Sequence, residues 1–364
     1  MIVQDIVEKL DELAPLAYAE DYDNVGLLIG NKKEKVKGIL VTLDVLPEVI
    51  DEAIENDCNL IVSFHPIIFN SLKKITGKTY VERVIQKAIK HDISIFAIHT
   101  ALDNAFEGVN SAVCNILNLI NKSILIPQSK TIKKLTTYAP SKDAKKVREA
   151  LFKAGGGSIG NYENCSFNSN GIGTYKGNNN SNPYFGKPNK DENLEEIKID
   201  IIYAKHLESS ILSSLFKSHP YESVAYETYT LENINQFIGM GMIGDLEKKM
   251  SENDFINFVK KTMKSDLIRH SKFMNKQIKK VAVLAGSGSF AIESAKLAKA
   301  DAFITSDLKY HDFFKAENEI LLLDIGHYES EQYTKNVLEA YLKKKIPNFA
   351  VLLSKINTNP VKYK

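Results

Sequence analysis

The amino-acid sequence predicts an α/β protein whose parallel-sheet core is split by an inserted α+β domain. Strand and helix patterns alternate from the start of the chain to about residue 127, and they alternate again after about residue 246. Between these regions lies a shorter run of strands and helices with a Gly- and Asn-rich stretch. Alternating strands and helices favour parallel sheets with right-handed crossovers. We therefore expect a discontinuous core, residues 1–128 and 246–364, and an inserted domain, residues 129–245.

Apolar periodicity predicts the elements of the first half of the core. A helix over residues 2–13 would place Ile2, Ile6, Leu10 and Leu13 on one face. The elements expected after it are a strand at 36–44, a helix at 47–56 entered through proline, a strand at 58–63, a helix at 79–90, a strand at 93–98 and a helix at 109–120.

The inserted domain is predicted to be a small α+β layer. Its expected elements are a strand at 135–139, a helix at 141–154, a strand at 197–204, a helix at 207–218 and a strand at 223–231. The Gly- and Asn-rich segment that includes residues 178–183 is interpreted as surface loop, with or without short strands. The spacing βα(β)βαβ predicts a ferredoxin-like layer.

The second half of the core begins with a basic stretch that we expect to be helical, at 252–263 and again at 265–276. The elements expected after it are a strand at 280–285, a helix at 290–299, a strand at 302–305, a helix at 311–318, a strand at 320–325, a helix at 330–344 and a strand at 349–353.

Three buried strands are each followed closely by a histidine, and in two cases a carboxylate follows four positions later. The five candidate ligands are His65, His99, Asp103, His327 and Glu331. Such groups gather at the carboxyl ends of the strands in an open parallel sheet, where ligands bind. Imidazole and carboxylate together suit a divalent cation such as Zn, Fe, Mn or Co. Because the candidates come from both halves, neither half of the core would make the site alone.

Each candidate also has a purely structural explanation. A histidine before a proline, as at His65, is common in turns, and His99 with Asp103 could cap a helix. The pair His327 and Glu331, four residues apart, could be a local charge pair on a helix. Their shared position after strand ends favours one metal or catalytic site.

Other motifs carry less information. The turn Gly286–Ser289 could cradle a phosphate or could simply be a tight turn, because it lacks the lysine of a P-loop. The motif His219–Glu222 is interpreted as a short turn rather than a catalytic site. Asp324 and Glu329 are interpreted as structural acids. The lysines of residues 260–264 are interpreted as a solvated helix face, with no nucleic-acid partner indicated.

Composition limits the class of protein. The 364 residues include 44% hydrophobic and 25% charged side chains, with a net charge of +2, which gives no global attraction to nucleic acid or to an anionic membrane. No apolar run approaches the roughly 18 residues of a membrane helix. Three widely spaced cysteines are expected to be reduced thiols, and we therefore expect a cytoplasmic protein.

Several motifs in order resemble the GTP cyclohydrolase 1 type 2 homologue family, also called NGG-one-interacting-factor-three-like proteins. The motifs are Tyr22–Leu27, His65–Pro66, His99–Asn104, Gly160–Tyr162 with Cys165–Phe167, His219–Glu222, Thr305–Asp312 and Gly326–Glu331. The resemblance implies a two-metal centre at the five candidate ligands, a hexameric assembly and an insert similar to PII and CutA proteins. The family commonly has two histidines before the proline, whereas this chain has Phe64 at the first position, which removes one donor. The resemblance therefore implies one or two metals per chain: a mononuclear site, or a second, weaker metal completed by water.

Two functional hypotheses follow. The first is a metal-dependent hydrolase acting on a nucleotide or another phosphate-bearing small molecule. The second is a non-enzymatic, metal-holding or regulatory homo-oligomer whose insert binds a ligand or a partner. The sequence names neither the metal nor the reaction.

Overall fold

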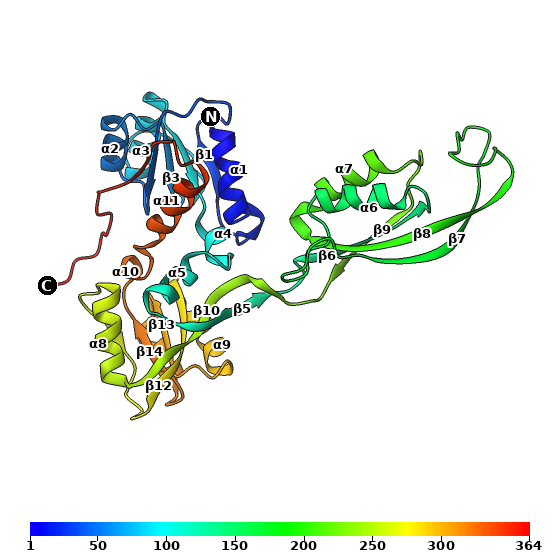
Figure 1. The fold of residues 1–364 in the computed structure, drawn as a ribbon. Helices are drawn as coiled ribbons and strands as arrows, with labels where there is room; N and C mark the ends of the chain where they lie inside the picture. The colour runs from blue at the N-terminus through cyan, green and yellow to red at the C-terminus, as the bar shows by residue number, and fades with distance from the viewer. The chain divides into compact units, whose positions relative to one another are not determined.

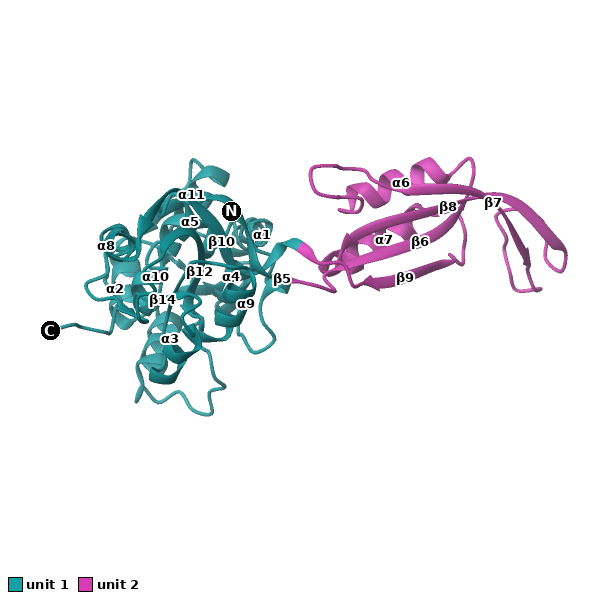
Figure 2. Ribbon diagram, turned by 90° about the horizontal axis from the view of Figure 1, so that it is seen from below, with its two compact units in different colours: residues 1–127, 236–364 teal, residues 128–235 magenta.

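The computed structural model describes residues 1–364 and divides into two compact units (Figure 2). Unit 1 comprises Met1–Pro127 and Gln236–Lys364, and unit 2 comprises Gln128–Asn235. The second boundary falls about ten residues earlier than the sequence predicts. The reason is β10 (Asn235–Ser251), a strand missing from the predicted elements, which pairs with β12 (Gln277–Ser287) in a sheet of unit 1.

The first sheet of unit 1 has the order β1-β4-β3-β2-β15. Its strands are β1 (Gly26–Ile29), β2 (Ile39–Thr42), β3 (Leu60–Ser63), β4 (Ser94–Ala97) and β15 (Val351–Leu353). All run parallel except β1, which pairs antiparallel with β4. The strand predicted at 349–353 is present as β15 and pairs with β2 at the edge of this sheet.

Both faces of the first sheet are covered by helices (Figure 1). Alternate residues of β2 divide between two apolar clusters: Ile39 and Val41 pack with α1 (Val3–Leu13) and α11 (Thr334–Lys345). Leu40 packs with the opposite pair of helices. Those helices are α2 (Pro47–Glu55) and α3 (Tyr80–Lys90). Strands buried on both faces are expected of a parallel α/β sheet.

The second sheet of unit 1 has the order β11-β14-β13-β12-β10-β5. Its other strands are β5 (Ile120–Gln128), β11 (Arg269–His270), β13 (Ala302–Ser306) and β14 (Leu321–Asp324). β12, β13 and β14 are parallel, whereas β10 runs antiparallel to β12 and β11 runs antiparallel to β14. The core of unit 1 is therefore a mixed α/β arrangement of two sheets.

The two sheets share one apolar cluster. Val283 and Ile304 of the second sheet belong to the same buried cluster as Val41 of the first. Helices α5 (Val109–Ile116) and α8 (Glu252–Met263) contribute to it, and α9 (Ile292–Leu297) packs on the other face of the second sheet. Because the two sheets share this cluster, the ends of strands from distant parts of the sequence lie close together.

The expected helix at 265–276 is wrong. Helix α8 ends where Lys264 adopts a left-handed conformation, with φ +52°. The Ser265 hydroxyl then donates to the carbonyls of Leu267 and Ile325, and Arg269 forms an ion pair with Asp324. These contacts hold the segment extended against β14, where it supplies the short strand β11.

Unit 2 is a four-stranded antiparallel sheet with the order β7-β8-β6-β9. Its strands are β6 (Ile132–Pro140), β7 (Phe167–Lys176), β8 (Asp191–Ala204) and β9 (Tyr226–Leu231). Helices α6 (Ala144–Lys153) and α7 (Glu208–Ser218) bury one face of the sheet (Figure 1). The Asn-rich segment 178–183 lies in the loop that joins β7 to β8.

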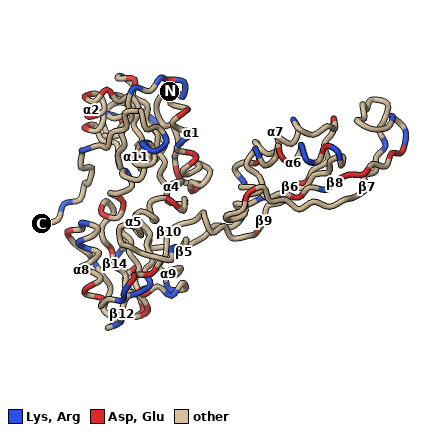
Figure 3. The backbone as a smooth tube through the Cα atoms, viewed as in Figure 1, with Lys and Arg blue, Asp and Glu red and all other residues tan.

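Basic and acidic residues are interspersed along the backbone (Figure 3). In α8 the residues Phe255, Val259 and Met263 are buried, whereas Lys260 and Lys261 are exposed, as expected of a solvated helix face. No helix combines the length and apolar character that crossing a bilayer would require.

Candidate metal centre

Three histidines lie just beyond the carboxyl ends of three strands of unit 1. His65 follows β3, His99 begins the short helix α4 (His99–Asn104) after β4, and His327 begins α10 (His327–Glu331) after β14. The backbone around them is fixed by hydrogen bonds: the His65 N–H donates to Leu43 O at 3.0 Å, and the His99 N–H donates to Phe64 O at 2.9 Å. His99 has φ +21°, a conformation that few non-glycine residues adopt.

His65, His327 and Glu331 converge. Oε2 of Glu331 lies 3.1 Å from Nε2 of His65 and 3.1 Å from Nε2 of His327. One ligand atom from each of the three residues lies within 4.8 Å of the others. The first sheet supplies one of these residues and the second sheet supplies two, because the two sheets share a core.

His99 and Asp103 line the same cavity without joining that three-residue cluster. The cavity has a volume of about 380 Å³. The His99 ring centroid lies 5.1 Å from that of His65, and Oδ1 of Asp103 is buried without a hydrogen-bond partner. All five sequence-predicted residues therefore border one space, but only three of them lie at mutual ligand distance.

Each imidazole contacts a carboxylate through Nδ1. The three contacts are His65 to Asp44 at 2.8 Å, His99 to Asp23 at 2.9 Å and His327 to Asp307 at 2.6 Å. A carboxylate at Nδ1 fixes the ring and leaves Nε2 free as a ligand, as is usual for metal-binding histidines. Sequence reasoning did not select these three acids. Asp44 and Asp307 also follow strand ends, so the same pattern could have identified them.

The acids determine the charge of the cluster. Burial lowers the pKa of His65, but Asp44 and Glu331 outweigh it and raise the pKa to about 10. Burial likewise opposes Asp307 and Glu331 at His327, whose pKa rises to about 11. Burial would raise the pKa of Glu331, but the two histidines lower it to about 2. The surroundings therefore favour positive charge at this point, which protons or a divalent cation can supply.

Two buried oxygens indicate that a cation fits. Although both imidazoles lie close to Glu331 Oε2, neither directs a well-aligned N–H at it, and it has no hydrogen-bond partner. Burial and the charge of Glu331 raise the pKa of Asp103 well above its usual value. Gly286, with φ +73°, leaves room for the carboxylate, since a Cβ there would lie 2.4 Å from Glu331 Oε1. Nitrogen and oxygen donors at one buried point suit a divalent transition metal.

Phe64 occupies the position next to His65 and is fully buried, with 0% of its surface exposed. Its ring centroid lies 4.8 Å from that of His65 and 5.4 Å from that of His99. A large apolar side chain thus fills one side of the cluster and belongs to the core of unit 1.

The neighbouring motifs have structural partners. Gly286 and Ser287 line the cavity, and the Ser287 hydroxyl donates to Asp307. Asp324 pairs with Arg269, and Glu329 accepts a hydrogen bond from Asn359 Nδ2 at 3.0 Å.

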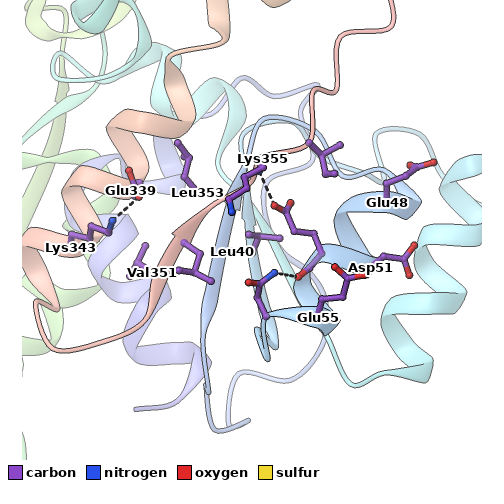
Figure 4. Close-up of a pocket in the computed structure, with 13 residues that line it drawn as sticks. Leu40, Glu48, Asp51, Glu55, Glu339, Lys343, Val351, Leu353 and Lys355 are labelled. Carbon is purple, nitrogen blue, oxygen red and sulfur yellow. Dashed lines mark hydrogen bonds and ion pairs between the residues drawn. The ribbon is translucent and has the colours of Figure 1, made fainter.

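A larger cavity of about 880 Å³ lies away from this cluster, beside β15 and α2 (Figure 4). It is rich in acids, but several are already paired. Glu339 accepts from Lys343 at 2.7 Å, and Glu52 accepts from the Lys355 N–H at 2.8 Å. The first pair lies within α11, and the second connects α2 to the C-terminal segment, so both acids have a structural role.

The fold and the cluster define an α/β protein with histidine and carboxylate side chains gathered at strand ends. The family model described as Duf34/NIF3 (NGG1p interacting factor 3) matches residues 1–360. This chain belongs to that family.

Relatives and solved structures agree with this assignment. A Bacillus subtilis protein named GTP cyclohydrolase 1 type 2 homolog is 35% identical over 98% of this chain and 97% of its own length. A Halalkalibacterium halodurans protein of the same name is 38% identical, over 98% and 97% of the two chains. The crystal structure of a Bacillus cereus protein related to NIF3 has a TM-score of 0.88 and 34% identity, covering 100% of this chain and 99% of that one.

Proposed function

We propose that the chain binds a divalent cation at His65, His327 and Glu331, with His99 and Asp103 completing the site, and that it is a metal-dependent hydrolase. The observation that carries the proposal is the convergence of three ligand atoms within 4.8 Å in a buried place where Glu331 Oε2 has no hydrogen-bond partner. A buried carboxylate oxygen that accepts no hydrogen bond costs free energy unless a cation or a proton compensates it.

When bound, such a cation polarises a substrate oxygen and lowers the pKa of a coordinated water. The chain itself supplies the orientation of the imidazoles, through Asp44, Asp23 and Asp307. Asp103 supplies a further carboxyl group whose Oδ1 has no hydrogen-bond partner, and this atom can take up or release a proton beside the cluster. Phe69 and Phe290 line the same cavity and would limit the access of bulk water.

The substrate we propose is a nucleotide or another phosphate-bearing small molecule. The cavity of about 380 Å³ is within the usual range for small-molecule sites. Tyr22, Phe69 and Phe290 line it and offer rings on which a base could stack, and Gly286 and Ser287 bring backbone close to the cluster. The name GTP cyclohydrolase 1 type 2 homolog, carried by the relatives, is in keeping with a nucleotide.

A specific observation favours a second candidate function, a metal-holding or regulatory homo-oligomer. Unit 2 is a separate compact body of about one hundred residues and holds none of the five site residues. Such a body is available to sense a ligand or to contact a partner. We propose a hexamer as the assembly, in keeping with the family resemblance, and light scattering on the purified protein measures its mass.

We further infer that unit 2 is a ferredoxin-like layer similar to PII and CutA proteins. The strand order β7-β8-β6-β9 and the two helices on one face support this inference. Strands and helices follow one another along the chain as β6, α6, β7, β8, α7 and β9, as in the βαββαβ motif.

The experiment that tests the metal site compares Glu331→Ala and His327→Ala with the native protein. Elemental analysis of the native protein should show a divalent transition metal, and both variants should lose it. His91→Ala is the matched control, because His91 is exposed at the end of α3, outside the cavity. Circular dichroism checks that the variants are folded. Unchanged metal content in folded variants would refute the site.

A screen of nucleotides then separates the two functions. Turnover by the native protein that is lost in Glu331→Ala and kept in His91→Ala supports a hydrolase. Metal retention with no turnover of any phosphate-bearing compound supports the regulatory assembly instead.

A further inference from the structure

Unit 2 has a cavity of its own, with a volume of about 400 Å³. It is bordered by the end of β7, the loop that follows it, Glu196 of β8 and the segment after α7. No residue of this cavity takes part in the candidate metal centre. Its volume is within the usual range for small-molecule sites and far larger than a metal ion needs.

Aromatic rings make up much of its wall. Tyr175, Tyr184 and Tyr221 line the cavity. The rings of Tyr184 and Tyr221 have centroids 6.2 Å apart and planes tilted by 55°, so they form an open corner. Lys142 Nζ lies 4.6 Å from the Tyr184 centroid, a cation–π distance.

A carboxylate without a cationic partner lies beside this corner. Oε1 of Glu196 accepts a hydrogen bond from the Tyr221 hydroxyl at 2.6 Å, and no lysine or arginine lies within 4.0 Å of it. Gly173 on the paired strand leaves room for the group, since a Cβ there would lie 2.1 Å from Glu196 Oε2. Lys176 also lines the cavity, but its ammonium group pairs with Asp191 at 3.6 Å. Glu196 therefore forms no ion pair within the unit.

The motif His219–Glu222 builds one wall of this cavity. His219 is buried, donates from Nε2 to Tyr138 O at 3.0 Å and accepts the Tyr221 N–H at Nδ1 at 3.2 Å. Burial lowers the pKa of His219, which keeps the ring in the neutral form that these two bonds require. Glu222 Oε1 accepts the Asn182 N–H at 2.9 Å and so ties the loop after β7 to the wall. The motif thus holds Tyr221 and the loop in place.

We propose that this cavity binds a small organic cation of the quaternary or methylated ammonium class, held between Tyr184 and Tyr221 and neutralised by Glu196. The faces of aromatic rings carry negative electrostatic potential and attract such cations with little cost of desolvation. The cation supplies the charge that Glu196 lacks. A neutral ligand would leave that carboxylate uncompensated, and an anion would be repelled by Glu196 and Glu222.

The test uses choline and its uncharged isostere 3,3-dimethylbutan-1-ol, which have the same shape and differ in charge. Binding to the full-length protein is followed by ligand-observed NMR and by quenching of tyrosine fluorescence. Choline should bind and the isostere should bind at least about tenfold more weakly. Equal binding of the two compounds, or no binding of choline at millimolar concentration, would overturn the proposal.

Variants locate the site. Glu196→Gln should weaken choline binding by about tenfold, whereas Glu195→Gln, the exposed neighbour on the same strand, should leave it unchanged. Tyr184 is 45% exposed, so its replacement should not disturb folding. Tyr184→Phe should keep the affinity and Tyr184→Leu should reduce it, because only the first retains an aromatic face. Equal affinity for choline in Tyr184→Leu and Tyr184→Phe would show that the Tyr184 ring does not contribute to binding and would refute the assignment.

Discussion

Each of the three histidines at the candidate metal centre directs its Nδ1 atom at a carboxylate, so the ring nitrogen that remains for a cation is Nε2. His327 is the clearest case, because Asp307 lies 2.6 Å behind it and Glu331 lies 3.1 Å in front of it. A carboxylate in this position orients the ring and makes the opposite nitrogen a better donor. Metal affinity should therefore depend on residues that never contact the metal.

The first prediction is that Asp307→Asn lowers the affinity for Zn²⁺ or Mn²⁺ by about 10- to 100-fold while the protein stays folded. The asparagine has nearly the same shape but lacks the charge that supports the His327 ring. Isothermal titration calorimetry measures the affinity. Asp266→Asn is the control, because Asp266 is exposed and lies outside the cavity. Equal affinities in the two variants would show that Asp307 does not support the metal site.

The second prediction concerns Phe64, which is fully buried beside His65 and His99. Without metal, Phe64→His should lower the free energy of unfolding by about 1–3 kcal/mol, because a polar ring replaces an apolar one in the core. With metal, the new imidazole should become a ligand, and metal should stabilise this variant more than it stabilises the native protein.

Urea unfolding with and without Zn²⁺ measures the difference. Phe64→Leu is the control, because it changes the packing and adds no donor. If metal stabilises Phe64→His no more than it stabilises the native protein, then having phenylalanine instead of histidine at position 64 has no effect on metal binding.

The three histidines were predicted from the sequence, whereas the carboxylates that contact their Nδ1 atoms were not. His65, His99 and His327 each follow an apolar strand, and parallel strands bring such positions to one edge. Asp23 lies on a loop before β1, a strand too short and too weakly patterned to predict, and only the folded chain brings it to His99. Geometry within the cavity separates His65, His327 and Glu331 from the other two candidates, and spacing in the sequence does not contain that information.

At the scale of elements, Glu82 connects the start of α3 to the loop before it. Its carboxylate accepts the Thr76 N–H at 2.6 Å, the Thr76 hydroxyl at 2.8 Å and the Lys78 N–H at 3.2 Å. The same loop carries Phe69, which lines the cavity of the candidate metal centre. One acid at a helix N-terminus therefore restrains a segment that borders the site.

The third prediction is a pH dependence of this restraint. The hydrogen bonds from Thr76, led by its hydroxyl, lower the pKa of Glu82 from 4.5 to about 2. A carboxylate with a lowered pKa stabilises the fold above its unfolded pKa, and the stabilisation is lost as the pH falls through the folded value. Glu82→Gln should therefore be less stable than the native protein at pH 7.

The difference should shrink as the pH falls from about 4.5 towards 2, where the native carboxylate also becomes protonated. Chemical unfolding at a series of pH values measures it. Glu55→Gln, an exposed change at the end of α2, should show no such trend. A stability difference that is constant with pH would mean that the charge of Glu82 is not responsible.

Long, strongly periodic elements were predicted and edge elements were missed. The helix predicted at 252–263 is present as α8, with its apolar stripe buried. The helix predicted at 265–276 is absent, because Ser265 and Arg269 find partners on neighbouring strands that a local pattern does not reveal. β10 is a strand with several glycines, and its pairing with β12 is a property of the folded sheet.

At the scale of the whole molecule, unit 2 is inserted between two neighbouring strands of one sheet. β5 leads into the unit and β10 leads out of it, and the two strands are adjacent in the second sheet of unit 1. The backbones approach closely, since a Cβ on Gly239 would lie 2.1 Å from Ile126 O. Removing the unit should therefore leave two strand ends that a short turn can join.

The fourth prediction is that deleting residues 129–234 and joining the ends by Asn-Gly gives a folded protein that still binds metal, because no proposed ligand is removed. Gel filtration and elemental analysis measure this outcome. Deleting residues 129–245 is the matched comparison, since it also removes most of β10, including the buried Ile238 and Met242. That shorter protein should aggregate. Equal behaviour of the two deletions would show that β10 is not needed by the core.

The last strand of the chain, β15, has a consequence for protein synthesis. It pairs with β2 through Val351 and Ile39, so one edge of β2 has no partner until residue 353 has been made. This edge of β2 therefore stays unpaired while the residues between β2 and β15 are being synthesised. A ribosome that stalls before residue 351 would leave the edge open to pairing with other nascent chains.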